Sequence, residues 1–123
     1  MPMSASKSIA VPNALILISD LDGGVPPDVM GESLIASTPS CIAVGCMSDS
    51  NGETEVILGA TQEVDPNDNP AFVGELETRN RAIVVRTVLR EPIVQAPVPR
   101  SSTRVRIWVN HPTEPDKVTI GFD

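Results

Sequence analysis

Prolines occur throughout this chain, and they limit the length of any helix it can form. The 123 residues include twelve prolines, well above the usual share of about 5%. A proline inside a helix removes a backbone hydrogen bond and clashes with the preceding turn. No window free of proline and glycine keeps the apolar spacing of an amphipathic helix. The chain is therefore expected to fold as short segments joined by turns.

Short apolar or alternating segments recur between turn-forming residues, as they do in all-β proteins. They cover residues 14–19, 33–37, 40–48, 53–59, 71–78, 82–89, 93–98, 103–110 and 117–122. Together they predict one all-β domain over residues 13–123, an antiparallel β-sandwich of about seven or eight short strands. Residues 1–12 are expected to be a flexible N-terminal segment.

Three of these segments carry further information. Residues 14–19 form a run that is aliphatic up to Ser19, which predicts a central strand buried on both faces. An Asn51-Gly52 turn separates residues 40–48 from residues 53–59 and predicts a hairpin between them. Prolines interrupt residues 93–98, so this segment is expected at the edge of a sheet.

Residues 103–110 alternate most regularly. The apolar side chains at positions 105, 107 and 109 share one face and are expected in the core, beside those at 118, 120 and 122 of a hairpin partner. The opposite face carries Arg104, Arg106 and Trp108. Two interpretations stay open for it: a ladder that covers the sheet and pairs with acidic side chains, or a protein interface, where Arg and Trp are enriched.

The charges are divided unequally along the chain. Residues 1–78 hold twelve acidic residues and one base, Lys7, whereas residues 79–123 hold eight bases and four acidic residues. The two halves can neutralise each other on folding or can present separate fields to partners. The net charge of −7 and the lack of stacking aromatics weigh against nucleic-acid binding.

The sequence predicts a cytoplasmic protein that does not associate with membranes. The apolar run over residues 9–18 is interrupted by Pro12 and is shorter than the roughly 20 residues that span a bilayer. Cys41 and Cys46 are five positions apart on a predicted strand, so they point to opposite faces and are not expected to form a disulfide. Buried free thiols are typical of a reducing compartment.

Three motifs suggest chemistry, and each has a plainer interpretation. Asp20 and Asp22 resemble the paired aspartates of haloacid-dehalogenase-type phosphatases, but that fold is α/β and larger than this chain. Residues 65–72 are similar to a calcium-binding cadherin linker, yet one residue short, and their Asp, Asn and Pro are also turn formers. His111 lies in a proline-rich loop without a visible nucleophile. We expect no catalytic residue, no metal ligand and no cofactor.

The second half of the chain resembles a known family. Residues 73–77 form an outward-acidic strand, residues 82–88 a β-branched one, and residues 105–109 and 117–122 a closing pair after a proline-led turn. This order is similar to that of small bacterial acidic β-proteins, the competence-protein-J type of nuclease inhibitor. The resemblance implies a cytoplasmic protein that binds a basic nuclease or toxin through acidic side chains. The acidic residues available are Glu53, Glu55, Asp65, Asp68, Glu75 and Glu77.

The leading hypothesis is a non-enzymatic bacterial protein-binding domain, either an inhibitor or immunity-type protein or a structural module. Its acidic charge would steer a basic partner. The alternative is a carbohydrate- or calcium-binding sandwich module, and a small hydrolase is third. Sugar platforms need exposed aromatic faces, and this chain has only three aromatic residues. The predicted partner-binding residues are Arg104, Arg106, Trp108, Glu53, Glu55, Glu75 and Glu77.

Overall fold

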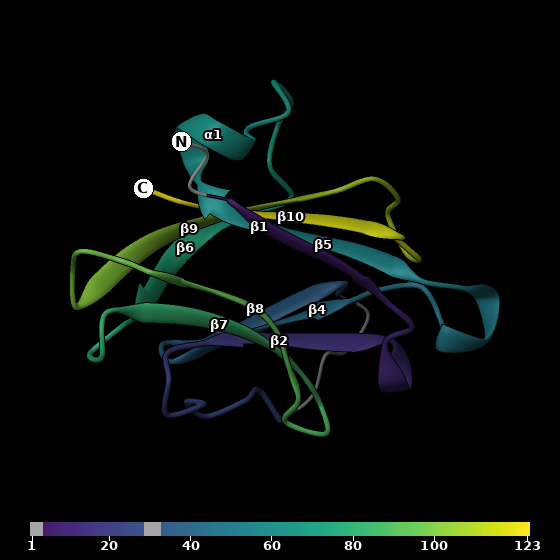
Figure 1. The fold of residues 1–123 in the computed structure, drawn as a ribbon, viewed down its shortest axis with the longest axis horizontal. Helices are drawn as coiled ribbons and strands as arrows, with labels where there is room; N and C mark the ends of the chain where they lie inside the picture. Colours follow the sequence, from purple (N-terminus) through teal and green to yellow (C-terminus); the bar gives the residue numbers. More distant parts are fainter. Residues whose placement is uncertain (1–3, 29–32) are drawn as a thin grey trace.

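Alternating aliphatic side chains give the strands an apolar face, and two packed sheets bury these faces against each other (Figure 1). The structure is a computed structural model that describes residues 4–28 and 33–123. It is a single all-β domain, and the predicted β-sandwich is confirmed, with ten strands in the described residues.

The sheet that we call sheet A is the upper layer in Figure 1. Its strands, in spatial order, are β1 (Ala5–Ile9), β5 (Thr54–Ala60), β10 (Lys117–Phe122), β9 (Ser102–Val109) and β6 (Phe72–Glu77). Sheet B is the lower layer, in the order β3 (Ile35–Thr38), β4 (Cys41–Gly45), β2 (Leu15–Ser19), β7 (Ala82–Thr87) and β8 (Pro92–Pro97).

In the part of the chain that the structure describes, three short helical turns connect these strands: η1 (Pro12–Ala14), η2 (Asp49–Asn51) and α1 (Thr61–Val64). Within the described residues, no helix has the length and apolar character needed to cross a membrane.

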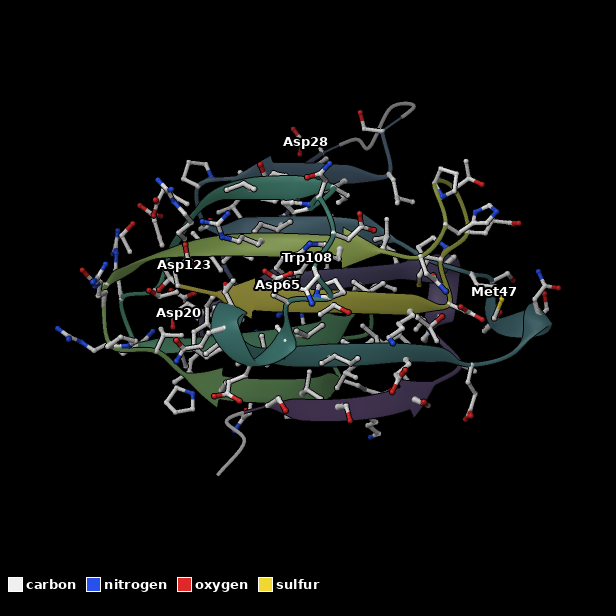
Figure 2. The ribbon with its side chains drawn as sticks, turned by 90° about the horizontal axis from the view of Figure 1, so that it is seen from above. Asp20, Asp28, Met47, Asp65, Trp108 and Asp123 are labelled. Atoms are coloured by element: carbon white, nitrogen blue, oxygen red, sulfur yellow. The ribbon has the colours of Figure 1, made fainter. Side chains whose placement is uncertain are left out.

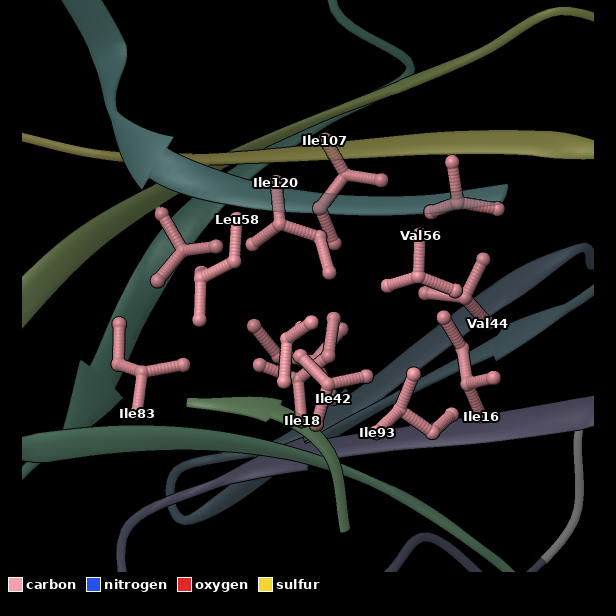
Figure 3. Packing of buried hydrophobic residues seen from close by; sticks show 14 of the residues in the cluster. Ile16, Ile18, Ile42, Val44, Val56, Leu58, Ile83, Ile93, Ile107 and Ile120 are labelled. Atoms are coloured by element: carbon pink, nitrogen blue, oxygen red, sulfur yellow. The ribbon is translucent and has the colours of Figure 1, made fainter. Parts of the chain in front are cut away.

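Buried aliphatic side chains from both sheets fill the space between them (Figure 3). Ile16 and Ile18 rise from β2, and Leu58, Ile107 and Ile120 come from sheet A; all are fully buried. Burying such a side chain contributes about 1.5–3 kcal/mol. The predicted central position of β2 and edge position of β8 are confirmed, as is the β9–β10 hairpin, in which Ile120 lies opposite Ile107. The predicted burial of β2 on both faces is wrong, because Leu15 and Leu17 on its outer face are only half-buried.

The prediction of a flexible segment over residues 1–12 is wrong for Ala5–Ile9, which form β1 and pair antiparallel with β5. Ala5 and Ile9 pack against the core, while the intervening Ser-Lys-Ser stretch is exposed. Because the strand lies at an edge, it needs few apolar residues, so its sequence carries little β signal. Lys7 lies opposite Val56, on the inward side of the edge, where a charge discourages further strand pairing.

The predicted hairpin across Asn51-Gly52 is also wrong. β4 belongs to sheet B and β5 to sheet A, so η2 carries the chain from one layer to the other. The chain does turn at Gly52, which has a φ of 130°. The turn does not decide which strands pair. β5 pairs instead with β1 and, in parallel, with β10. Sheet A is therefore mixed rather than purely antiparallel.

Candidate functional site

The outer face of sheet A brings together part of the predicted partner-binding set. Arg104, Arg106 and Trp108 alternate along β9 with the buried Val105 and Ile107, as the sequence predicts. The segment that follows β5, α1 and the loop after it, crosses this face (Figure 2). Figure 2 looks onto the face and places Trp108 beside Asp65 near its middle and Asp123 toward one end.

Trp108 is covered rather than exposed, although it is on the outward face of β9. Only 5% of the residue is exposed. Its indole Nε1–H donates to the backbone oxygen of Asp68 at 2.9 Å, so the loop of residues 65–71 is fastened to the sheet at this point. Trp108 therefore faces outward, as the alternation predicts, but a segment remote in the sequence lies on top of it.

Two adjacent glycines allow α1 to approach the sheet. Gly59 of β5 and Gly121 of β10 are partners across the parallel pair. A Cβ at Gly121 would lie 2.9 Å from Thr61 Oγ1 and 3.1 Å from Trp108 Cζ3, and one at Gly59 would lie 2.8 Å from Val64 Cγ1. A glycine in a strand interior often marks such a close approach. This signal was available in the sequence and was not used.

Arg106 is paired with Asp123, and the pair is also tied to α1. Arg106 Nη2 lies 3.0 Å from Asp123 Oδ2, and its Nε donates to the same carboxylate. Thr61 Oγ1 donates to Asp123 Oδ1 at 2.6 Å. These hydrogen bonds, from Arg106 first and then Thr61, lower the pKa of Asp123 below its ordinary value near 3.8. The pairing with Asp123 raises the pKa of Arg106.

Arg104, near the start of β9, makes a longer and more exposed ion pair than Arg106 does. Its Nε lies 3.4 Å from Glu75 Oε1, with both side chains more than half exposed. Ser102 Oγ donates to the other Glu75 oxygen at 3.3 Å. The cross-strand register sets this pair, because Glu75 lies directly opposite Arg104 in the β6–β9 ladder. Arginines of the second half do pair here with acidic residues, as the ladder interpretation predicts.

Of the other three predicted residues, Glu55 also lies on the outer face of sheet A, between the buried Thr54 and Val56, whereas Glu53 precedes β5 and Glu77 ends β6. Glu53 is exposed beside the η2 turn, and Glu55 lies in register with Lys117 at the start of β10. Glu77 borders a hollow of about 320 Å³ that is also lined by Asp20, Asp22 and Arg79. The seven predicted residues therefore do not form one patch. That each contacts a partner stays a prediction.

The loop after β5 carries three acidic side chains, of which Asp65 and Asp68 are among those that the family resemblance offers for partner binding. We call residues 61–70 the acidic loop; its Glu63, Asp65 and Asp68 are all exposed. Asp65 Oδ1 accepts from Asn67 N at 2.7 Å, and Asp68 Oδ1 accepts from Asn69 N at 2.8 Å. These are turn hydrogen bonds of the kind that Asp forms with its own backbone. These hydrogen bonds agree with the interpretation of the Asp and Asn residues as turn formers.

The residues that suggested catalysis have structural partners. Asp20 is 3% exposed, and its Oδ2 accepts from both the backbone and the side-chain nitrogen of Asn80. The backbone carbonyls of Asp20 and Leu21 accept from Arg86 of β7, which fixes the turn after β2. His111 Nδ1 accepts from the backbone nitrogens of Thr113 and Glu114 and so shapes its own loop. Among the described residues, no three His, Cys, Asp or Glu side chains are arranged to hold a metal ion.

Both cysteines are buried and free of disulfides. Burial raises the pKa of Cys41 to about 11 and also raises the pKa of Cys46. Because the thiolate is the reactive form, neither thiol has the character of a nucleophile at neutral pH.

Comparison with known proteins gives a match in fold. No protein-family model matches the sequence, and no curated protein matches it. The crystal structure of ComJ from Bacillus subtilis, an inhibitor of the DNA-degrading activity of NucA, superposes with a TM-score of 0.71. The match covers 99% of this chain and 97% of ComJ. This chain shares the fold of ComJ.

The two sequences are only 11% identical, so the likeness is one of architecture. A second solved structure, named crocagin biosynthetic gene J, has a TM-score of 0.49, with 13% identity and 96% coverage of both chains. The resemblance drawn from residues 71–123 is confirmed as a resemblance in fold to ComJ, and it extends over nearly the whole chain.

Proposed function

We propose that this protein is a non-enzymatic, inhibitor-type binding domain whose partner is a basic protein, with a nuclease as the first candidate. The observation that carries the proposal is the match to ComJ, which spans both chains almost from end to end. No inserted domain separates the two folds, so a binding surface on one has a structural counterpart on the other.

Charge supports the choice of partner. The net charge is −7, and no base occurs between Lys7 and Arg79. Opposite charges speed the encounter of two proteins and restrict the choice of partner. The same charge would repel a nucleic acid, so the proposed partner is the nuclease rather than its substrate. Two buried free thiols support the cytoplasm as the place of action.

The alternative functions have less support. A carbohydrate platform needs an exposed aromatic face, whereas Trp108 and Phe122 are buried and Phe72 is half-buried. These three are all the aromatic residues of the chain. A phosphatase of the type suggested by Asp20 and Asp22 would need an α/β fold, and this fold is all β.

Affinity capture from the source cell, followed by mass spectrometry and reconstitution with the purified partner, tests the proposal. We expect one basic protein to be retained at low salt, to be released at high salt, and to lose enzymatic activity when the complex forms. Retention of a polysaccharide or a nucleic acid, or of no macromolecule, would contradict the proposal.

A further inference from the structure

β6 is an edge strand of sheet A, and one side of its backbone has no neighbouring strand. β9 pairs antiparallel with its other side, and β6 is the last strand in the order of the sheet. In an antiparallel ladder, residues whose N–H and C=O face the paired strand alternate with residues whose groups face away from it. Every second residue of β6 therefore directs its backbone polar groups to the free edge.

Two backbone hydrogen bonds show which residues of β6 these are. Glu77 N donates to Pro39 O at 2.9 Å, so its N–H faces away from β9. Arg104 of β9 lies directly opposite Glu75, and its carbonyl accepts from Asp123 N at 3.0 Å, on the side of β10. The backbone groups of that pair therefore do not bond each other. Both observations place the odd-numbered residues of β6 on the free edge.

Val73 and Glu75 are the odd-numbered residues that this edge leaves open. Among the described residues, none of the backbone hydrogen bonds outside the strand ladders involves either of them. The edge thus presents two N–H donors and two C=O acceptors in the spacing of a β-ladder. An extended peptide backbone is the group that complements such an edge.

The other edge strands in the described residues carry features that discourage the addition of a strand. β8 begins and ends with proline and has a register shift against β7. β1 carries Lys7 on its inward side, and β3 is only four residues long. β6 has six residues without a proline, a base or a register shift. It is therefore the edge best suited to accept a further strand.

The charges on β6 select the kind of segment that it can accept. Glu75 and Glu77 are both exposed on the outer face, and the strand carries no base. Glu75 is held only by the long, exposed pair with Arg104, and Glu77 belongs to neither ion pair found among the described residues. A second copy of β6 would bring carboxylates close together, which is unfavourable, whereas lysine or arginine opposite them is favourable.

Apolar surface at this edge adds to the fit. Val73 is 45% exposed on the outer face, where the aliphatic stem of a lysine or arginine can cover it. Phe72 lies on the inner face opposite Ile107 and is half-buried. An added strand with apolar side chains on its inward positions would extend the core over the phenyl ring.

We infer that β6 is the docking strand for the basic protein partner, and that an extended segment of this partner adds to sheet A beside it. The backbone of the segment bonds to Val73 and Glu75. Its outward side chains are lysine or arginine facing Glu75 and Glu77, and its inward side chains are apolar. This inference rests on the proposed function and specifies its surface. It places the contact on β6 and away from Glu53.

A peptide titration tests the inference without the natural partner. The probe is a short blocked peptide in which lysine and valine alternate. With ¹⁵N-labelled protein, the amides of Val73 and Glu75 should exchange quickly before the peptide is added, whereas those of Gly74 and Leu76, which face β9, should be protected. The probe should shift the signals of Val73 and Glu75 in a saturable way and slow their exchange.

Two control peptides separate strand addition from attraction between charges. One carries glutamate in place of lysine, and the other carries a methyl group on the backbone nitrogen of each lysine, which removes the N–H groups that face β6. Neither should bind. Equal binding of either control, saturable shifts confined to another edge or face, or no binding of the probe would overturn the inference. Slow exchange of Val73 and Glu75 in a dimer of the protein alone would make a second copy the occupant.

Variants of the protein give a second, independent test. Val73→Pro removes an outward N–H and no bond to β9, a position where an edge strand tolerates proline. It should weaken the probe roughly fivefold, as expected for one backbone hydrogen bond. Glu77→Gln should weaken it about threefold, as expected for one exposed ion pair. Glu53→Gln, an exposed carboxylate outside β6, is the matched control and should leave affinity unchanged.

The same variants separate this inference from the proposed function. If the captured partner binds the wild-type protein, Val73→Pro and Glu77→Gln equally, the docking strand is wrong while the protein-binding function stands. If the wild-type protein captures no basic protein, the proposed function fails, and the peptide titration still decides whether β6 accepts a basic strand.

Discussion

The two ends of the outer face of β9 differ, although the same alternation produces both. At one end Trp108 is buried beneath the acidic loop and bonded to Asp68. At the other end Arg104 is open to solvent and pairs loosely with Glu75. Alternation decides which face a side chain takes, but only the rest of the fold decides whether something covers it.

The covered end also concentrates tertiary contacts that the open end lacks. Residues 59–61 and 121–123, two separate stretches of sequence, meet here: Gly121 lies against Thr61 and Trp108, and Asp123 is bonded to Thr61 and Arg106. We therefore expect substitutions at the covered end to disturb the acidic loop, and substitutions at the open end to have local effects.

Ile107→Ala measures how much stability is lost when a buried side chain on the same strand is truncated. Ile107 is fully buried and lies opposite Ile120. Its truncation should lower the free energy of unfolding by about 2–5 kcal/mol, measured by urea denaturation. Val73→Ala, at an exposed position of β6, should change it by no more than about 0.5 kcal/mol. Similar losses in the two variants would mean that the faces of sheet A have been assigned incorrectly.

Gly121→Val tests whether α1 packs closely against Gly121. The added side chain would meet Thr61 and Trp108 at distances that require one of them to move. Overpacking of this kind costs about 1–3 kcal/mol, and here it should also expose the Trp108 indole to solvent, detected as stronger quenching of its fluorescence by iodide. Gly45→Ala, where the closest contact is with the end of the Leu34 side chain, should leave quenching unchanged. Unchanged quenching in Gly121→Val would show that α1 does not rest on this glycine.

Asp123→Asn tests the link between Arg106 and α1 through pH. The pKa of Asp123 is lowered in the folded state, so its ionised form stabilises the protein above the ordinary value near 3.8. That contribution is lost as pH falls through the lower, folded-state pKa. The melting temperature of the wild type should therefore exceed that of the variant at neutral pH, and the difference should shrink in acid. A difference that is constant down to strongly acidic pH would contradict this linkage.

Arg104→Ala should have the smallest effect. Its ion pair with Glu75 is long and exposed, and pairs of this kind contribute at most about 1 kcal/mol. A double-mutant cycle with Glu75→Ala in low and high salt measures the coupling. A coupling as large as the effect of Ile107→Ala would show that the open end is as tightly organised as the covered end.

Much of the fold was predictable because it depends on local patterns. The alternation over residues 103–110 correctly placed Ile107 inside and Arg106 outside, and the prolines correctly placed β8 at an edge. The predictions were wrong where contacts between residues distant in the sequence decide which strands pair. Nothing local indicates that β5 leaves β4 and pairs in parallel with β10, or that β1 completes the edge of sheet A.

The candidate site was less predictable for the same reason. Trp108 and Asp68 are 40 positions apart, and no periodicity relates them. The one usable signal was the presence of Gly59 and Gly121 in strand interiors, which marks a close approach without naming the segment that approaches. The acidic residues of the loop were recognisable as turn formers, and their position on the outer face of sheet A required the structure.

Hydrogen exchange of the indole N–H measures directly whether the acidic loop is fastened over Trp108. Trp108 is the only tryptophan, so its Nε1–H signal is unambiguous in a ¹⁵N spectrum. The bond to the Asp68 carbonyl and the burial of the ring predict exchange much slower than that of a free indole, and faster exchange in Gly121→Val. Exchange in the wild-type protein as fast as that of a free indole would mean that the loop does not cover Trp108.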